Sequence, residues 1–181
     1  MVSSPVAKTV VPADARPQSR CIACGPDHPH GLRLKFHAGP DGVAEAEWTP
    51  TADWEGFEGI IHGGVVSTVL DEAMAKAVVA RHSHALTGEL RVRFHTHVEP
   101  GARYIIRGWV AEQKKRLLKT EAALLAAGGG ECAHAWAMFV ELPRRRGDAA
   151  VSDGMTARLP GRESSAGRQP RTEPDVPSNS I

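Results

Sequence analysis

A short glycine motif precedes the most apolar stretch of the chain. His62-Gly63-Gly64 follows the β-branched pair Ile60-Ile61, and residues 65–80 contain neither glycine nor proline. This pattern predicts a helix of about four turns that begins at the glycines and is buried on most of its circumference. The N–H groups of a helix's first turn lack partners within the helix and carry partial positive charge, which suits an oxygen that becomes negative. The motif is therefore a candidate oxyanion-binding element of an ester- or thioester-cleaving site.

Asp71 is the candidate acid on the same helix. At about 100° per residue, seven residues return almost to the same face, so Asp71 and Gly64 share one stripe. No basic residue stands at helical spacing from Asp71, and an unpaired buried carboxylate is costly unless it is hydrogen-bonded. Asp71 is thus either a functional carboxylate or a structural hydrogen-bond partner of a neighbouring strand. The helix rise separates it from Gly64 by about 10 Å, too far for both to serve one site within one subunit.

Glu72 points away from this stripe and is followed four residues later by Lys76. Glutamate and lysine in this order and spacing favour an ion pair on the helix surface. The alternative is that Glu72 contributes to a substrate site.

Two of the three cysteines form the pair Cys21-x-x-Cys24, with His28 and His30 close behind. A structural zinc site uses four ligands, and a second cysteine or histidine pair at suitable spacing is not evident. The odd number of cysteines argues against a disulfide scaffold and is typical of a reducing compartment. We therefore expect packed thiols, no metal and no cofactor.

Alternating runs on both sides of the helix predict strands. Residues 31–37 and 43–48 are expected to form a hairpin around the turn residues 39–42. Further strands are expected over 85–98, 103–112, 117–126 and 132–142, with Tyr104, Ile106 and Trp109 as buried positions. A single helix buries itself all round only if a sheet curls about it. The predicted class is therefore α+β, with an antiparallel sheet of about five to six strands around one long central helix.

The chain resembles the hotdog-fold acyl-CoA thioesterases, in particular their PaaI-like and THEM-type branch. The resemblance covers about residues 21–142. It rests on His62-Gly63-Gly64 with an acid nine residues after the histidine, on the segments CIACG (21–25) and HPHGL (28–32), and on LTGELRVRF (86–94). It implies the hotdog fold and hydrolysis of an acyl-CoA to a free acid and CoA. It also implies a homodimer or dimer of dimers with active sites at the dimer interface.

The resemblance also implies roles for single residues. The amide of Gly64 would polarise the thioester carbonyl, and Asp71 of the other protomer would be the general base or nucleophile. Thr87 matches a residue that positions the water in the THEM-type branch, or else it is an ordinary strand residue. His62 would orient the glycine turn or hydrogen-bond the substrate, next to Gly63.

Other candidates concern substrate binding. Coenzyme A carries several negatively charged phosphate groups, so we expect basic side chains at the rim of its binding site. The alternative is that the basic candidates are surface residues in contact with water alone. The candidates are Arg91, Arg93, Lys114, Lys115 and Arg116. Trp54 and Phe57 either form the acyl end of the pocket or cover the start of the helix. The acyl group itself depends on how Trp54, Phe57, Met74 and Trp109 pack.

Composition and charge exclude several classes. The 181 residues include 22 basic and 21 acidic side chains, which gives no whole-protein case for nucleic-acid binding. No stretch reaches the roughly 18 apolar residues of a membrane span, and residues 1–20 lack a signal-peptide pattern. We expect a cytoplasmic protein with a flexible arm (1–20), one hotdog domain (21–143) and a disordered tail (144–181) that begins with Arg144-Arg145-Arg146.

Two other functions stay open at this stage. One is a non-catalytic acyl-CoA-binding or sensing hotdog module, a class that is usually attached to a DNA-binding segment. The other is a hotdog enoyl-CoA hydratase, whose usual Asp and His pair is not evident here. The acid at position 71 favours hydrolysis over both.

Overall fold

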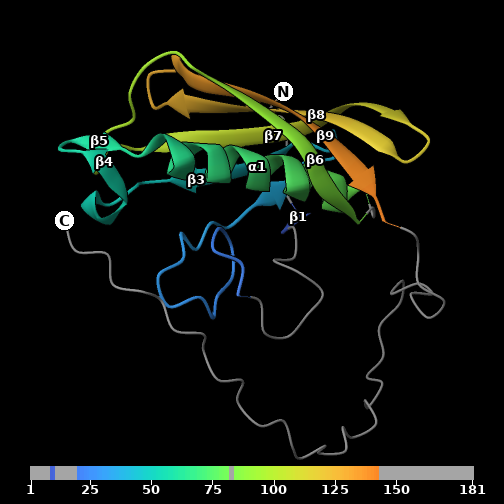
Figure 1. The fold of residues 1–181 in the computed structure, drawn as a ribbon, viewed down its shortest axis with the longest axis horizontal. Coiled ribbons are helices and arrows are strands. Elements are labelled where there is room, and N and C mark those ends of the chain that lie inside the picture. The colour runs from blue at the N-terminus through green and yellow to red at the C-terminus, as the bar shows by residue number, and fades with distance from the viewer. Residues whose placement is uncertain (1–8, 11–19, 82–83, 143–181) are drawn as a thin grey trace, which may run out of the picture. The chain divides into compact units, whose positions relative to one another are not determined.

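The computed structural model describes residues 9–10, 20–81 and 84–142 (Figure 1). Almost all of the predicted arm and the whole predicted tail, with its arginine run, lie outside the described residues. One α-helix, α1 (Gly63–Ala80), runs along one face of a large sheet. Its bounds agree with the sequence prediction, since it begins at the glycine pair and ends at the cap residue Arg81.

Seven strands form an antiparallel sheet in the order β1-β2-β3-β7-β8-β9-β6. Five of them are long enough to build the core, and β1 and β2 have two residues each. Their bounds are β1 (Thr9–Val10), β2 (His37–Ala38), β3 (Ala44–Trp48), β6 (Ala85–Phe94), β7 (Tyr104–Lys114), β8 (Leu117–Ala126) and β9 (Glu131–Glu141). The predicted α+β class is confirmed.

A small second unit of structure precedes the helix. The 3-10 helix η1 (Ala52–Trp54) leads into β4 (Glu55–Phe57), which pairs with β5 (Ile60–Ile61). The Ile61 amide also donates to the Val98 carbonyl at 2.8 Å. These contacts fix the chain at the point where α1 begins.

The helix packs closely on the middle of β7. Tyr104, Ile106 and Val110 are buried in the core, and Gly108 stands among them on the same face. A Cβ atom at Gly108 would lie 2.5 Å from the Ala73 carbonyl oxygen, so only glycine leaves room for the helix backbone here. The small residues Ala73 and Ala77, both fully buried, make the same close approach possible from the helix side.

Two predictions about the strands were wrong in detail. Residues 31–36 form no sheet strand, because the amides of Leu32 and Leu34 donate to the carbonyls of Ile22 (2.7 Å) and Ala23 (2.9 Å). Trp109 is not a core residue. It alternates with the helix-facing positions of β7 and lies on the opposite face of the sheet, where its ring is 6.0 Å from that of His134. Trp109 therefore does not line a pocket beside the helix.

Candidate active site

His62 caps the helix with both its backbone and its side chain. Its carbonyl accepts from the amides of Val65 (2.9 Å) and Val66 (3.2 Å), and its Nδ1 accepts from the Gly64 amide at 2.9 Å. The N–H group expected to bind an oxyanion is thus held by an imidazole. An incoming carbonyl oxygen would have to displace the imidazole from the Gly64 N–H group or share that N–H group with it. Gly63 and Gly64 are both exposed, so the approach to these amides is open.

The segment before the helix surrounds this cap. The His62 amide donates to the Trp54 carbonyl at 2.8 Å, and a Cβ at Gly56 would lie 2.9 Å from the imidazole Cδ2. Trp54 is half-buried, whereas Phe57 is 79% exposed. On the other side, a Cβ at Gly63 would lie 3.5 Å from the ring of Phe94 in β6. The backbone of Trp54 therefore lies at the helix start, with Phe94 as an additional aromatic neighbour, and a contact of Phe57 with the helix stays a prediction.

Asp71 and Thr87 lie together, sixteen residues apart in the sequence. The Thr87 hydroxyl donates to Asp71 Oδ1 at 2.8 Å. Burial raises the pKa of the Asp71 carboxyl above its usual range, the Thr87 hydrogen bond opposes this shift, and the nearby Glu72 charge adds to it. A half-buried carboxylate with a raised pKa and a fixed hydroxyl neighbour has the properties of a general base.

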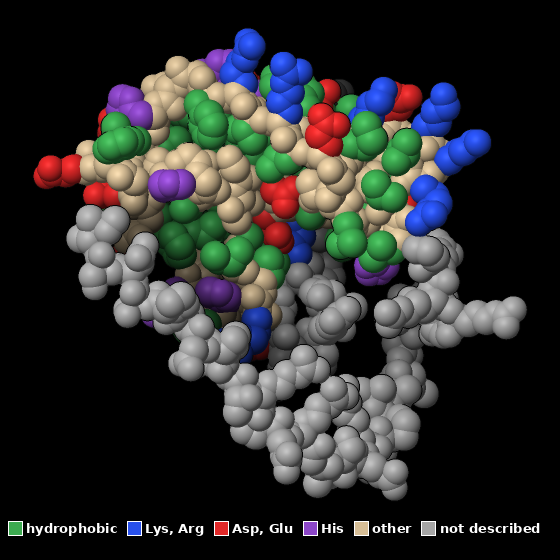
Figure 2. Space-filling view, in the orientation of Figure 1, with side chains coloured by type: hydrophobic (Ala, Val, Ile, Leu, Met, Phe, Trp, Pro, Cys, Tyr) green, Lys and Arg blue, Asp and Glu red, His purple; other side chains and the backbone are tan. Residues whose placement is uncertain are grey.

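The stripe from Gly64 to Asp71 is only partly covered by the described part of the chain. Ser67 and Thr68 are half-buried, and their hydroxyls donate back to the carbonyls of Gly63 and Gly64, each at 2.9 Å. The neighbouring strand β6 exposes Leu90 and Phe94 on the sheet face that carries Thr87. Exposed hydrophobic side chains appear among charged ones on the viewed face (Figure 2). The two candidate chemical groups thus border one open surface without meeting in a single protomer.

Glu72 lies in a different place from the one predicted. The ion pair with Lys76 forms at 3.3 Å, but the side chains of Lys76 and Glu72 are only 6% and 13% exposed, so it is not a surface pair. Cys21 Sγ donates to the other carboxylate oxygen, Oε2, at 3.6 Å. The N-terminal cysteines therefore pack on Glu72. Sequence reasoning missed this contact, because Cys21 of the half zinc motif and the carboxylate of Glu72 lie 51 residues apart in the chain.

The basic candidates separate into two groups. Arg91 and Arg93 stand opposite Trp136 and His134 in the β6–β9 register, on the sheet face that alternates with the Thr87 and Phe94 face. Lys114 ends β7, and Lys115 and Arg116 form the β7–β8 turn, where Arg116 donates through Nε and Nη2 to the Glu141 carbonyl at 3.0 and 2.8 Å. The structure therefore does not bring Arg91 and Arg93 to Asp71.

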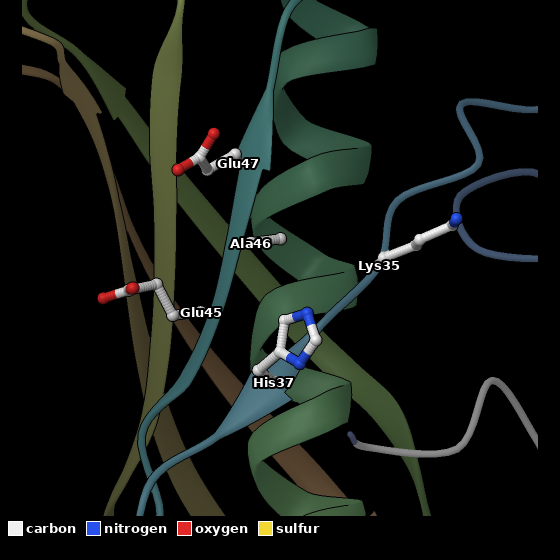
Figure 3. A pocket seen from close by; sticks show the side chains of 5 residues that line it. All are labelled: Lys35, His37, Glu45, Ala46 and Glu47. Atoms are coloured by element: carbon white, nitrogen blue, oxygen red, sulfur yellow. The ribbon is translucent and has the colours of Figure 1, made fainter. Parts of the chain in front are cut away.

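A shallow hollow at β2 and β3 is not a convergent site. It is lined by Lys35, His37, Glu45, Ala46 and Glu47. Glu45 and Glu47 extend on one side of β3 while Lys35 points the other way (Figure 3). Glu45 also pairs with Arg107 at 3.3 Å.

The chain is similar to known thioesterases in sequence and in fold. Residues 58–133 match the model of the thioesterase superfamily. A solved thioesterase superfamily protein matches with a TM-score of 0.63 at 23% identity, over 65% of this chain and 61% of that protein's length. The Escherichia coli PaaI protein of the phenylacetic acid degradation operon matches with a TM-score of 0.58 at 18% identity, over 62% of this chain and 81% of that one. A hypothetical thioesterase from Streptococcus pneumoniae, solved with coenzyme A, matches with a TM-score of 0.58 at 14% identity, over 62% and 88%.

No curated protein matches this chain. Among the described residues, no helix has both the length and the apolarity to cross a membrane. The family match covers the helix, the acid, the strands β6, β7 and β8 and the start of β9, and the solved structures share the fold. Residues 58–133 match the thioesterase superfamily model, and the fold is the hotdog fold predicted from the sequence.

Proposed function

We propose that this protein hydrolyses an acyl-CoA to a free acid and CoA. The observation that carries the proposal is the 2.8 Å hydrogen bond from Thr87 to Asp71. It fixes a carboxylate with a raised pKa beside the open helix stripe that starts at Gly64.

In the proposed reaction, the ionised Asp71 carboxylate removes a proton from water as the water attacks the thioester carbonyl carbon. The electron pair of the carbonyl moves to oxygen, where the Gly64 amide of a second protomer stabilises the negative charge. The carbonyl then re-forms, the C–S bond breaks, and the proton goes to the CoA thiolate. Attack by Asp71 itself, through a mixed anhydride that water hydrolyses, is the second route that the same geometry supports.

The substrate class follows from the fold relatives and from charge. The streptococcal neighbour was solved with coenzyme A. In this chain, Lys114 and Lys115 are exposed at the β7–β8 turn. Register links Leu117, Val140 and Leu86 across β8, β9 and β6, so this turn lies at the same sheet end as Thr87. We propose that these lysines form part of the basic rim that binds the CoA phosphates. Arg116 instead donates a hydrogen bond to the Glu141 carbonyl.

The test is thiol release from short, long and aromatic acyl-CoAs, with a correction for the protein's own cysteines. Asp71→Asn should lower kcat/KM by about 100-fold or more, the loss typical of a missing general base. The matched control is Asp41→Asn, because Asp41 is exposed in the β2–β3 turn. Its Oδ1 accepts a hydrogen bond from the Val43 amide, and the asparagine Oδ1 can accept the same bond. Unchanged turnover in Asp71→Asn would disprove the assignment of the acid.

The competing function is an acyl-CoA-sensing module. It would bind the same acyl-CoAs without turnover in either the wild type or the variant. Calorimetric binding with no thiol release from any panel member would therefore replace the hydrolase proposal with the sensing one.

A further inference from the structure

The Cys21–Cys24 pair, Glu72 and Lys76 form a cluster on the side of α1 away from the Asp71 stripe. The ligand atoms of Cys21, Cys24 and Glu72 all lie within 4.8 Å of one another. Cys24 and Lys76 are buried, and Cys21 and Glu72 are half-buried. The proposed hydrolysis uses none of these four residues.

The spacing agrees with tetrahedral coordination. Zn–S bonds of about 2.3 Å and Zn–O bonds of about 2.0 Å place a sulfur and an oxygen ligand about 3.5 Å apart at tetrahedral angles. The observed separation between Cys21 Sγ and Glu72 Oε2 is 3.6 Å. Small side-chain rotations would therefore bring two sulfurs and one oxygen to one ion.

The local charges also balance around a divalent cation. Two thiolates and one carboxylate carry three negative charges, which a divalent ion and the Lys76 ammonium neutralise together. Glu72 can ligate through Oε2 while Oε1 keeps its 3.3 Å contact with Lys76 Nζ. An outer partner of this kind orients a carboxylate ligand.

The two thiols would enter such a site as thiolates, because a thiol that coordinates a cation is deprotonated outright.

We propose that Cys21, Cys24 and Glu72 bind one zinc ion. Binding forms two Zn–S bonds and one Zn–O bond, releases the two thiol protons to solvent, and leaves one tetrahedral position for a water. The ion ties the turn 21–25 to the middle of α1. Its role is structural, since it fixes the segment whose carbonyls hold Leu32 and Leu34.

The test is cobalt titration of the reduced full-length protein, because Co²⁺ in a thiolate site gives charge-transfer and visible ligand-field absorption. One equivalent should bind, and one equivalent of zinc should displace it. Cys21→Ser and Cys24→Ser should abolish the thiolate band, and Glu72→Gln should weaken binding at least tenfold. Cys132→Ser is the matched control, because Cys132 is a buried cysteine whose Sγ donates to the Gly130 carbonyl.

The wild-type titration decides the matter even if the serine variants fail to fold. Absence of a thiolate–cobalt band in the reduced wild type would overturn the proposal. A band retained in the folded serine variants, or lost in Cys132→Ser, would also overturn it. If mass and thiol counting of freshly purified protein show a Cys21–Cys24 disulfide and the reduced form binds no cobalt, the pair is a redox dithiol instead. None of these readouts depends on thioesterase activity, so this proposal and the proposed function fail independently.

Discussion

At the scale of single residues, Asp71 works against the stability of the fold. Burial raises the pKa of the Asp71 carboxyl in the folded chain. The protonated carboxyl therefore favours folding, and this stabilisation is complete only at a pH below the unfolded-state pKa. That contribution is lost as the pH rises through the folded-state pKa. At neutral pH the folded chain therefore carries a carboxylate that prefers water, which is typical of a residue kept for function.

Asp71→Asn should for this reason unfold at a higher temperature than the wild type at pH 7. Asparagine can still accept from Thr87 and carries no charge to desolvate. The difference should shrink as the pH falls below about 4, where aspartate is protonated in both folded and unfolded chains. Thermal unfolding of both proteins from pH 3 to 8 measures this. A variant less stable than the wild type at pH 7 would show that Asp71 has a structural role.

Thr87→Val should move the pH profile of hydrolysis. The Thr87 hydrogen bond lowers the pKa of Asp71, so its loss raises that pKa further, and the ionised base is lost at a higher pH. The acidic limb of kcat/KM should shift upward in Thr87→Val, while Thr87→Ser should keep the wild-type limb. An unshifted limb in a folded valine variant would separate Thr87 from the titrating group.

Some of the candidate site residues could be predicted from the sequence alone, and others could not. Asp71 stood out because no cation stands at helical spacing, whereas Thr87 became a candidate only through the family resemblance. Glu72 was misplaced because local spacing explained its partner Lys76 but not its burial. That burial depends on Cys21 and Cys24, whose contact with the helix is long-range.

At the scale of secondary-structure elements, the close packing of α1 on β7 depends on one missing side chain. Gly108→Ala would place Cβ 2.5 Å from the Ala73 carbonyl oxygen and 2.8 Å from the Met74 amide. These are backbone atoms, so relief requires a shift of the whole helix. We expect a loss of about 1–3 kcal/mol in the free energy of unfolding, the usual range for overpacking. Urea denaturation should show it, with Gly128→Ala as control, because a Cβ there meets nothing within 4 Å. Equal stability of the two variants would contradict this account.

Element boundaries were predictable where one pattern covered the whole element. The helix begins at a glycine pair, and residues 65–80 contain neither glycine nor proline. Both of its ends could therefore be predicted. Residues 31–36 alternate like a strand, yet they pair with the carbonyls of the cysteine turn, and Arg33 has a φ of +54° that interrupts an extended strand. Such pairing between neighbouring loops leaves no periodic signal in the sequence.

At the scale of the whole molecule, the described chain ends its sheet with an exposed strand. β6 is hydrogen-bonded to β9 and lies at the end of the strand order, with Leu86, Leu90 and Phe94 exposed. An unprotected edge of this length invites another strand. If two copies pair through β6 about a two-fold axis, their helices run antiparallel. Gly64 of one copy then approaches Asp71 of the other copy. The helix rise of about 10 Å separates these two residues only within one protomer, so acid and amide can meet across the pair.

Mixing two inactive variants tests this arrangement. Asp71→Asn removes the acid, and Gly64→Pro removes the amide hydrogen at a position in the helix's first turn, where proline is tolerated. Gly64→Ala is the control that adds a Cβ but keeps the N–H group. In a mixed dimer with sites shared between protomers, one site carries both defects and the other carries none. Co-refolding equal amounts should therefore restore about one quarter of wild-type activity, since half of the dimers are mixed and each has one intact site. If acid and amide act within one protomer, every site keeps a defect and the mixture stays inactive. Recovery would thus assign the active site to the interface of two copies and connect the open stripe of α1 with the open edge of β6.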